Sequence, residues 1–201
     1  MNANNYRGHL NEGPMDLSAV VAEMSDILRE MIGANIALQL NLEREGLWVK
    51  ADAGLIEQVV VNLISNARDA MPQGGSITVE TSRVNVDEDF LKRKAAESVG
   101  PRLPMPPPAP PEGNCVRLLV RDIGTGMDAA TKAMIFMPFW TTKEVGNGEG
   151  LGLCFVYGVV KNGGGGILVE SELGRGACFE VYLPEIPAPV GQREDLNRTN
   201  S

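Results

Sequence analysis

Residues 58–70 read QVVVNLISNARDA, and the rest of the fold can be placed around this stretch. Because an α-helix rotates by about 100° per residue, the polar side chains of the stretch fall within an arc of roughly 80°. These side chains are Gln58, Asn62, Asn66 and Asp69. Aliphatic residues occupy nearly the opposite face, at positions 56, 59, 60, 63, 64, 67 and 70. The pattern predicts a helix over about 53–71 that buries one face.

The polar face of this helix has two interpretations, because it can simply be solvated or it can bind a ligand. Asparagine is a poor helix former, and a solvated face is more often built from glutamate or lysine, which weakens the first interpretation. Carboxamide and carboxylate oxygens are hard ligands of the kind that Mg²⁺ accepts together with water and phosphate oxygens.

A glycine-rich stretch precedes another predicted helix. Residues 146–153 read GNGEGLGL and run into a helical pattern over 151–161. Backbone N–H groups at the start of a helix, with the positive end of its dipole, suit a phosphate, although a flexible loop is the more frequent role of such glycines. The dinucleotide fingerprint fits poorly because no strand immediately precedes the glycines, and the chain has no Gly-Lys-Ser/Thr of a P-loop.

A third stretch, 122–127, reads DIGTGM at the end of a predicted strand. The carboxylate of Asp122 can accept a hydrogen bond from the exocyclic amine of adenine, whereas guanine presents a carbonyl at that position. Gly124 and Gly126 would let a flat ring approach the backbone. The alternative is a plain strand-to-helix turn in which the aspartate caps the turn.

Hydrophobic periodicity places the remaining elements. Helical spacing covers 15–32 and 128–135, and strand alternation covers 36–42, 47–50, 76–84, 116–122, 167–170 and 178–183. With a hairpin expected at each end, through 45–46 and through 173–176, the order predicts an α/β fold. We expect a two-layer sandwich of a mixed, mostly antiparallel sheet with three main helices on one face.

We expect one domain at 14–187, a loose segment at 1–13 and a flexible tail at 188–201. Residues 86–114 interrupt the pattern, and 101–111 hold seven of the thirteen prolines. Proline lacks a backbone donor and favours extended polyproline geometry, so we expect a surface insertion and no core element here. A ligand for a proline-reading partner is the functional alternative.

Composition excludes several classes of function. With 26 acidic and 18 basic side chains the net charge is −8, which disfavours nucleic-acid binding. The three cysteines lack Cys-x-x-Cys spacing and His9 is the single histidine, so a disulfide framework, a zinc site and a Ser/His/Asp triad are not expected. Without a spanning apolar run or a signal-peptide pattern, we expect a cytoplasmic domain with no membrane contact of its own, which is compatible with a membrane-anchored parent protein.

Taken in this order, the three stretches resemble the Bergerat-type ATP-binding domain of sensor histidine kinases, in the superfamily shared with gyrase B, the heat-shock chaperone and MutL-type repair proteins. Residues 58–70 resemble the asparagine box, 122–126 the first glycine box, 135–143 (IFMPFWTTK) the phenylalanine box and 148–153 the second glycine box. The ending also matches, with GRG at 174–176 followed by Phe179 and Leu183-Pro184. The resemblance covers about 14–187.

This resemblance implies a Mg²⁺·ATP site. Asn66 would ligate Mg²⁺, Asn62 would lie beside the phosphates and Lys143 would approach them, and these three would be the catalytic residues. Asp122 would select adenine in a pocket shaped by Gly124 and Gly126, and Gly150 and Gly152 would hold a lid. Further ATP contacts are implied for Asp69, Phe136, Thr142, Gly148, Leu151 and Leu153.

The resemblance also implies the reaction. The hydrolysing relatives carry a glutamate base where this chain has Asn62, and a carboxamide cannot accept that proton, so hydrolysis should be slow. Phosphoryl transfer to a histidine needs mainly positioning and charge neutralisation. The helical hairpin that bears the acceptor histidine in these kinases is absent, so we expect a histidine-bearing dimerisation domain, on the same protein or on a separate chain, as partner and a response regulator receiver domain downstream.

Three departures and two alternatives accompany this prediction. Met137 replaces a usual acidic residue, and Ala177-Cys178 replace two threonines on the adenine side. Glu149 replaces a threonine in the second glycine box, where a carboxylate close to the phosphates would lower ATP affinity unless it points outward or pairs with a cation such as Lys143. The alternatives are a stand-alone protein serine kinase of the anti-sigma type and a nucleotide-binding interaction module without transfer activity.

Overall fold

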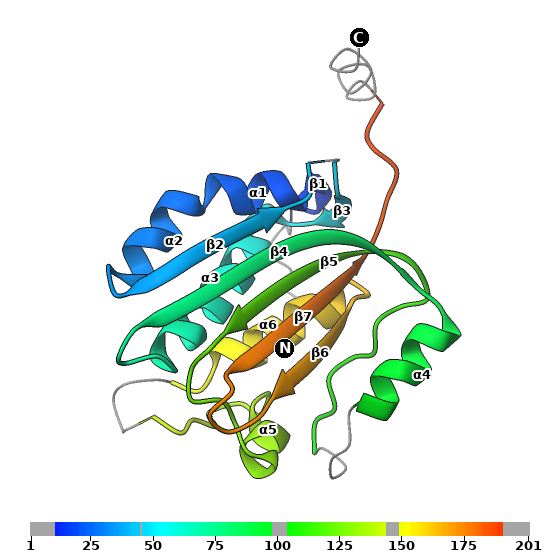
Figure 1. The fold of residues 1–201 in the computed structure, drawn as a ribbon. Coiled ribbons are helices and arrows are strands. Elements are labelled where there is room, and N and C mark those ends of the chain that lie inside the picture. The colour runs from blue at the N-terminus through cyan, green and yellow to red at the C-terminus, as the bar shows by residue number, and fades with distance from the viewer. Residues whose placement is uncertain (1–10, 45, 98–103, 144–148, 191–201) are drawn as a thin grey trace, which may run out of the picture.

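The computed structural model describes residues 11–44, 46–97, 104–143 and 149–190, which form a five-stranded sheet, a two-stranded sheet and a layer of helices (Figure 1). The larger sheet has the order β2 (Ile36–Leu42), β4 (Gly75–Val86), β5 (Gly113–Asp122), β7 (Ala177–Pro184) and β6 (Gly166–Ser171). β2 and β4 are parallel, and the other three pairs are antiparallel. The predicted mixed, mostly antiparallel sheet is confirmed.

One face of this sheet is covered by helices, and the two longest helices of this layer lie behind the strands in Figure 1. The layer consists of α1 (Leu17–Glu23), α2 (Ser25–Ile32), α3 (Ala53–Asp69) and α6 (Gly152–Asn162). In α3, Asp52 caps the first turn by accepting a hydrogen bond from Leu55 N at 3.2 Å. The predicted aliphatic face of α3 is buried, except that Ala70, just after the helix, is half-exposed. We call this sheet surface the helix face and the opposite one the outer face.

The N-terminal elements differ from the prediction in two ways. The helix expected at 15–32 begins at Leu17 and is divided at Met24, although hydrogen bonds from Met24 N to Val20 O (3.2 Å) and from Leu28 N to Met24 O (3.0 Å) cross the division. The hairpin expected through 45–46 is wrong, because β3 (Trp48–Ala51) pairs with β1 (Gly13–Asp16).

The N-terminal hairpin prediction failed because the partners of both strands are distant in sequence. Asp16 accepts hydrogen bonds from Ser18 N (2.9 Å) and Leu47 N (3.3 Å), and Leu17 N donates to Leu47 O at 3.0 Å. These bonds fix the start of β3 to the start of α1. β2 instead takes a parallel partner, which no turn sequence indicates.

The insertion between β4 and β5 is shorter than the predicted 86–114, and part of it packs against the sheet. β4 extends to Val86 and β5 begins at Gly113, so the inserted residues are 87–112. They include α4 (Glu88–Glu97), which packs on the outer face, where the rings of Phe90 and Tyr182 meet edge to face at 5.7 Å. The prediction that no part of this region joins a core is therefore wrong.

The proline-rich end of the insertion, residues 104–112, runs along the edge strand β6, and we call it the strap. Pro108 O accepts a hydrogen bond from Ile167 N at 2.8 Å, and Pro110 is buried. A Cβ on Gly166 would lie 2.2 Å from Pro110 N, so the close approach of the strap requires glycine at that position. The remaining helix, α5 (Ala129–Met134), is capped by Asp128, which accepts a hydrogen bond from Thr131 N at 2.7 Å. No helix in the described ranges is long and apolar enough to cross a membrane.

Candidate functional site

Asp122 lies at the end of β5 with its side chain toward the helix face, and the residue is only 5% exposed. Its Oδ1 accepts hydrogen bonds from Gly124 N (2.8 Å) and Ala177 N (3.2 Å), and Oδ2 has no partner among the described residues. Burial raises the pKa of Asp122 above its ordinary value, while the two backbone hydrogen bonds oppose that shift. The side chain therefore has one oxygen fixed by the protein and a second that can accept a ligand hydrogen bond.

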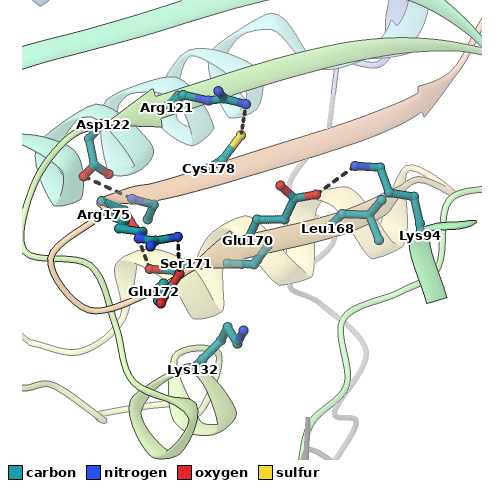
Figure 2. Close-up of a pocket in the computed structure, with 13 residues that line it drawn as sticks. Lys94, Arg121, Asp122, Lys132, Leu168, Glu170, Ser171, Glu172, Arg175 and Cys178 are labelled. Carbon is teal, nitrogen blue, oxygen red and sulfur yellow. Dashed lines mark hydrogen bonds and ion pairs between the residues drawn. The ribbon is translucent and has the colours of Figure 1, made fainter. Parts of the chain in front are cut away.

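Asp122 lines a pocket of about 460 Å³ at one end of the sheet (Figure 2). Ser171, Gly176 and Ala177 also line it, but its charged side chains Lys94, Arg121 and Glu170 lie on the outer face, opposite to the side chain of Asp122. Ser171 orders this wall, because its Oγ accepts a hydrogen bond from Met127 N at 2.9 Å and donates one to Gly176 O at 2.8 Å. The pocket therefore extends along the outer face, and Asp122 borders it at the end of β5.

The loop after Asp122 is fixed to the end of α3. Thr125 N donates to Ala70 O at 3.0 Å, and a Cβ on Gly124 would lie 2.6 Å from that same oxygen. Gly126 has φ 64°, and a Cβ there would lie 2.0 Å from Glu172 O. The two glycines thus allow the loop to contact both α3 and the β6–β7 turn.

The polar face of α3 borders the start of α6. Asn62 Oδ1 accepts a hydrogen bond from Gln58 Nε2 at 3.3 Å and lies 3.5 Å from the position of a Cβ on Gly152. Asn66, one turn further along, is half-buried, and its side chain makes no hydrogen bond to any described residue. Leu151, which precedes α6, provides no side-chain cap, so the first N–H groups of α6 have no capping side chain.

The segment between α5 and α6 returns to this same region. Phe139 N donates to Gly150 O at 3.0 Å, and a Cβ on Gly150 would lie 2.5 Å from Phe139 C, so the two ends of the segment are in contact. Phe139 is 76% exposed and has φ 63°, an unusual backbone conformation for a residue other than glycine. Lys143 Nζ forms an ion pair with Asp69 Oδ2 at the end of α3.

Asp69 accepts hydrogen bonds from two cations. Arg68 donates to Oδ1 through Nε (2.9 Å) and through a terminal nitrogen (2.7 Å), and Lys143 donates to Oδ2. Partial burial favours the neutral acid, but the hydrogen bonds and charges of Lys143 and Arg68 outweigh it and lower the pKa of Asp69. Asp69 is therefore ionised at neutral pH.

The structure brings most of the predicted residues together. Asn62, Asn66 and Asp69 lie along α3, Asp122, Gly124 and Gly126 meet the end of α3, and Gly150, Leu151, Gly152 and Leu153 lead into α6. Thr142 is exposed beside Lys143, whereas Phe136 is buried in the core with its ring 5.8 Å from that of Tyr157. Gly148 and His9 lie outside the described residues.

Two of the three departures now have a location. Ala177 and Cys178 point to opposite faces of the sheet, since Ala177 N reaches Asp122 while Cys178 Sγ accepts a hydrogen bond from Arg121 on the outer face at 3.7 Å. Cys178 therefore does not face the same side as Asp122. Glu149 is exposed, and the ammonium of Lys143 contacts Asp69 and not Glu149.

Sequence reasoning missed Ser171 and Arg68. Ser171 is the last residue of β6. A hydroxyl residue at the end of a strand, just before a glycine-containing turn, is the sequence signal that could have identified it. Arg68 lies between Ala67 and Asp69 inside the stretch 58–70, and its contact with α2 depends on tertiary structure.

Comparison with known proteins agrees with this geometry. A family model described as "Histidine kinase-, DNA gyrase B-, and HSP90-like ATPase" matches residues 51–187. The sensor kinase CckA of Brucella abortus is 42% identical over 188 residues, which make up 90% of this chain and 18% of CckA. The chain thus spans less than a fifth of the length of that relative.

Two solved structures have the same fold. The mycobacterial sensor histidine kinase MprB superposes with a TM-score of 0.64 at 21% identity, covering 88% of this chain and 99% of that one. Full-length ShkA, solved in complex with AMPPNP, gives a TM-score of 0.64 at 23% identity, covering 90% of this chain and 32% of that one.

Proposed function

The chain belongs to the histidine kinase-, DNA gyrase B- and HSP90-like ATPase family, and from this membership we propose that it is the Mg²⁺·ATP-binding catalytic domain of a sensor histidine kinase. The relatives include named sensor kinases. The proposal assigns the domain to residues 14–187 and places it in the cytoplasm.

The observation that carries the proposal is the environment of Asp122. The Asp122 residue is only 5% exposed, with Oδ1 held by two backbone N–H groups and Oδ2 without a partner among the described residues. Every buried side-chain nitrogen or oxygen of the described residues has a hydrogen-bond partner, so the unpaired Oδ2 keeps some contact with solvent, and a ligand donor can take the place of water there. Adenine supplies such a donor through its exocyclic amine, and guanine does not, so we assign Asp122 to adenine selection.

The phosphate end of the nucleotide is assigned to the region where α3, α6 and Lys143 meet. The uncapped N–H groups of α6 suit a polyphosphate, and Asn62 lies next to them. Lys143 provides a cation close by, although it is paired with Asp69 in the structure. Gly150 and Gly152 would hold the lid, and Thr142, Leu151 and Leu153 would border the phosphates.

The residues present fit a magnesium ion that is shared with the nucleotide. In the described part of the chain, no cluster of three or more His, Cys, Asp or Glu side chains is placed to hold a metal. Asn66 offers one free carboxamide oxygen, and Mg²⁺ usually combines one or two protein ligands with water and phosphate oxygens. When bound, the ion would neutralise charge on the transferred phosphoryl group. Asn66 would orient it.

We propose that the acceptor is a histidine on a dimerisation domain and that a response regulator receiver domain acts downstream. Asn62 stands where a hydrolytic base would be needed, and a carboxamide cannot take a proton from water, so slow hydrolysis favours transfer. Relatives that are sensor kinases support this assignment over the serine kinase and over a module without transfer activity.

The first test is ATP binding by the Asp122→Asn variant. An asparagine retains the shape but loses the charge of the acceptor, so we expect ATP affinity to fall by about 10- to 100-fold, in titration calorimetry with and without Mg²⁺. Asp128→Asn is the matched control, because Asp128 is an exposed helix cap and asparagine also caps helices well. Unchanged ATP affinity in Asp122→Asn would refute the assigned role.

The second test identifies the reaction. The chain is mixed with labelled ATP and a separate histidine-bearing dimerisation domain from a sensor kinase, and we expect label on the acceptor that is lost in acid. Acid-stable label on a protein serine would instead identify a serine kinase. Tight ATP binding without any transfer would favour the interaction module.

A further inference from the structure

Arg68 connects α3 to α2 through its guanidinium group. Besides its two bonds to Asp69 Oδ1, it donates to Ser65 Oγ at 3.3 Å and to Met31 O, in the last turn of α2, at 3.2 Å. Adjacent side chains on a helix do not normally face each other, so a pair between residues 68 and 69 requires the arginine to fold back. The additional bonds to Ser65 and Met31 hold it in that position.

Asp69 transmits this arrangement to Lys143, because its two oxygens serve different cations. Oδ1 is bound by Arg68 and Oδ2 by Lys143. All three side chains are partly buried, with exposures of 38% for Arg68, 26% for Asp69 and 32% for Lys143. A carboxylate that rotates freely would place the lysine in several positions, whereas one whose first oxygen is held by a guanidinium fork presents the second in a fixed direction.

The same pairing sets how strongly Asp69 competes with phosphate for Lys143. Arg68 offsets part of the negative charge of Asp69, so the carboxylate attracts the lysine less than an uncompensated carboxylate would. A polyphosphate must draw Lys143 away from Asp69 or share it. Removal of the guanidinium would leave Asp69 with Lys143 as its sole partner among the described residues.

We infer that Arg68 is a positioning residue for nucleotide binding, acting through Asp69 to place Lys143 and to keep it available to phosphate. The inference rests on the proposed function, because it needs Lys143 to meet the phosphates. It assigns to Arg68 no contact with the nucleotide. It also ties the position of the lysine to the end of α2, through Met31 O.

The test is a double-mutant cycle of ATP affinity, in the complete chain with Mg²⁺ present. We expect Arg68→Met to weaken ATP binding by about three- to tenfold, as for loss of a partly exposed charge pair. In an Asp69→Asn background the same substitution should change the affinity by less than about twofold, because the residue through which it acts is gone. Arg83→Met is the control, since its side chain is also 38% exposed and paired with a carboxylate, Glu185 at 2.6 Å, away from the site.

Arg68→Lys separates positioning from charge. Lysine keeps the positive charge but lacks the fork, so positioning predicts a loss close to that of Arg68→Met. Affinity equal to the unsubstituted chain in Arg68→Lys would overturn the inference in favour of a general charge effect. Equal losses with and without Asp69 would also overturn it, as would a lowered melting temperature without any change in affinity.

A readout without nucleotide keeps this inference separate from the proposed function. Arg68→Met should shift the NMR signals of both the Asp69 carboxyl carbon and the Lys143 ammonium, and Arg83→Met should shift neither. An unaffected Lys143 signal would overturn the inference even if ATP binds. Absence of ATP binding by the unsubstituted chain would refute the proposed function, while the Lys143 signal would still decide whether Arg68 positions that lysine.

Discussion

At the scale of single residues, two glycines with similar backbones have different surroundings. Gly126 has φ 64° and Gly174 has φ 76°, so both adopt the left-handed region that side chains disfavour. A Cβ on Gly126 would fall 2.0 Å from Glu172 O, whereas a Cβ on Gly174 would have nothing within 4 Å. At Gly174 only the backbone conformation favours glycine, whereas at Gly126 there is also no space for a Cβ atom.

This difference predicts the cost of two alanine substitutions. Gly174→Ala should lower the free energy of unfolding by about 1 kcal/mol, which is the conformational cost alone. Gly126→Ala should cost about 3 kcal/mol, because a backbone oxygen cannot move aside cheaply. Urea denaturation of both variants measures the difference, and equal costs would show that the loop relaxes around the added methyl group.

At the scale of elements, α4 is held on the outer face by charges as well as by ring contact. Lys94 bonds Glu170 at 2.8 Å and Glu180 at 3.1 Å, and Arg117 and the Tyr182 hydroxyl bond Glu180 at 3.2 Å and 2.7 Å. Glu180 is 4% exposed. Burial works to raise its pKa, but the hydrogen bonds from Tyr182 and Lys94 and the charges of Lys94 and Arg117 lower it below the ordinary 4.5.

The sign of this shift predicts a pH dependence of stability. The pKa of Glu180 is lower in the folded than in the unfolded chain, so ionised Glu180 adds to the free energy of unfolding above pH 4.5. This stabilisation is lost as the pH falls through the pKa that Glu180 has in the folded chain. Glu180→Gln should lower the free energy of unfolding by about 2 kcal/mol at pH 7. The difference in this free energy between the variant and the unsubstituted chain should become smaller below pH 4.5.

Urea unfolding at several pH values between 7 and 3 measures this dependence. Glu88→Gln is the control, because Glu88 pairs with Lys92 on the surface of α4 with its side chain 79% exposed. A constant difference between Glu180→Gln and the unsubstituted chain at all pH values would contradict the assigned shift.

At the scale of the whole molecule, the strap covers an edge of the sheet. β6 is an edge strand of the five-stranded sheet. The free backbone groups of an uncovered edge strand can pair with a strand of another chain. The strap bonds Ile167 N through Pro108 O, and Met105 packs against the core of the helix face. Its prolines have no N–H to offer a further strand, so the covered edge cannot readily be extended.

Replacement of residues 104–108 by glycine and serine at equal length should therefore uncover the edge. We expect faster hydrogen exchange at the Ile167 amide and self-association that increases with concentration in sedimentation. The same replacement at 187–190, where Val190 is fully exposed, is the control. Unchanged protection of the Ile167 amide would show that the strap does not hold this edge.

The sequence by itself determined the elements whose patterns are local and the motifs that they carry. α3 could be placed from its periodicity within two residues, and Asp122 could be placed at a strand end, because burial on one face leaves a repeat that is visible in a short window. The order of these motifs supplied the resemblance to known kinases, and the alternation of helical and strand patterns supplied the fold class.

Tertiary structure alone decided the pairing of β3 with β1, the packing of α4 and the strap, and the link from Arg68 through Asp69 to Lys143. Each depends on contacts between residues that are distant in sequence, or on which of several possible partners a charged side chain selects. A local pattern carries no record of that choice, because the same arginine, lysine or short strand is compatible with many partners until the chain has folded.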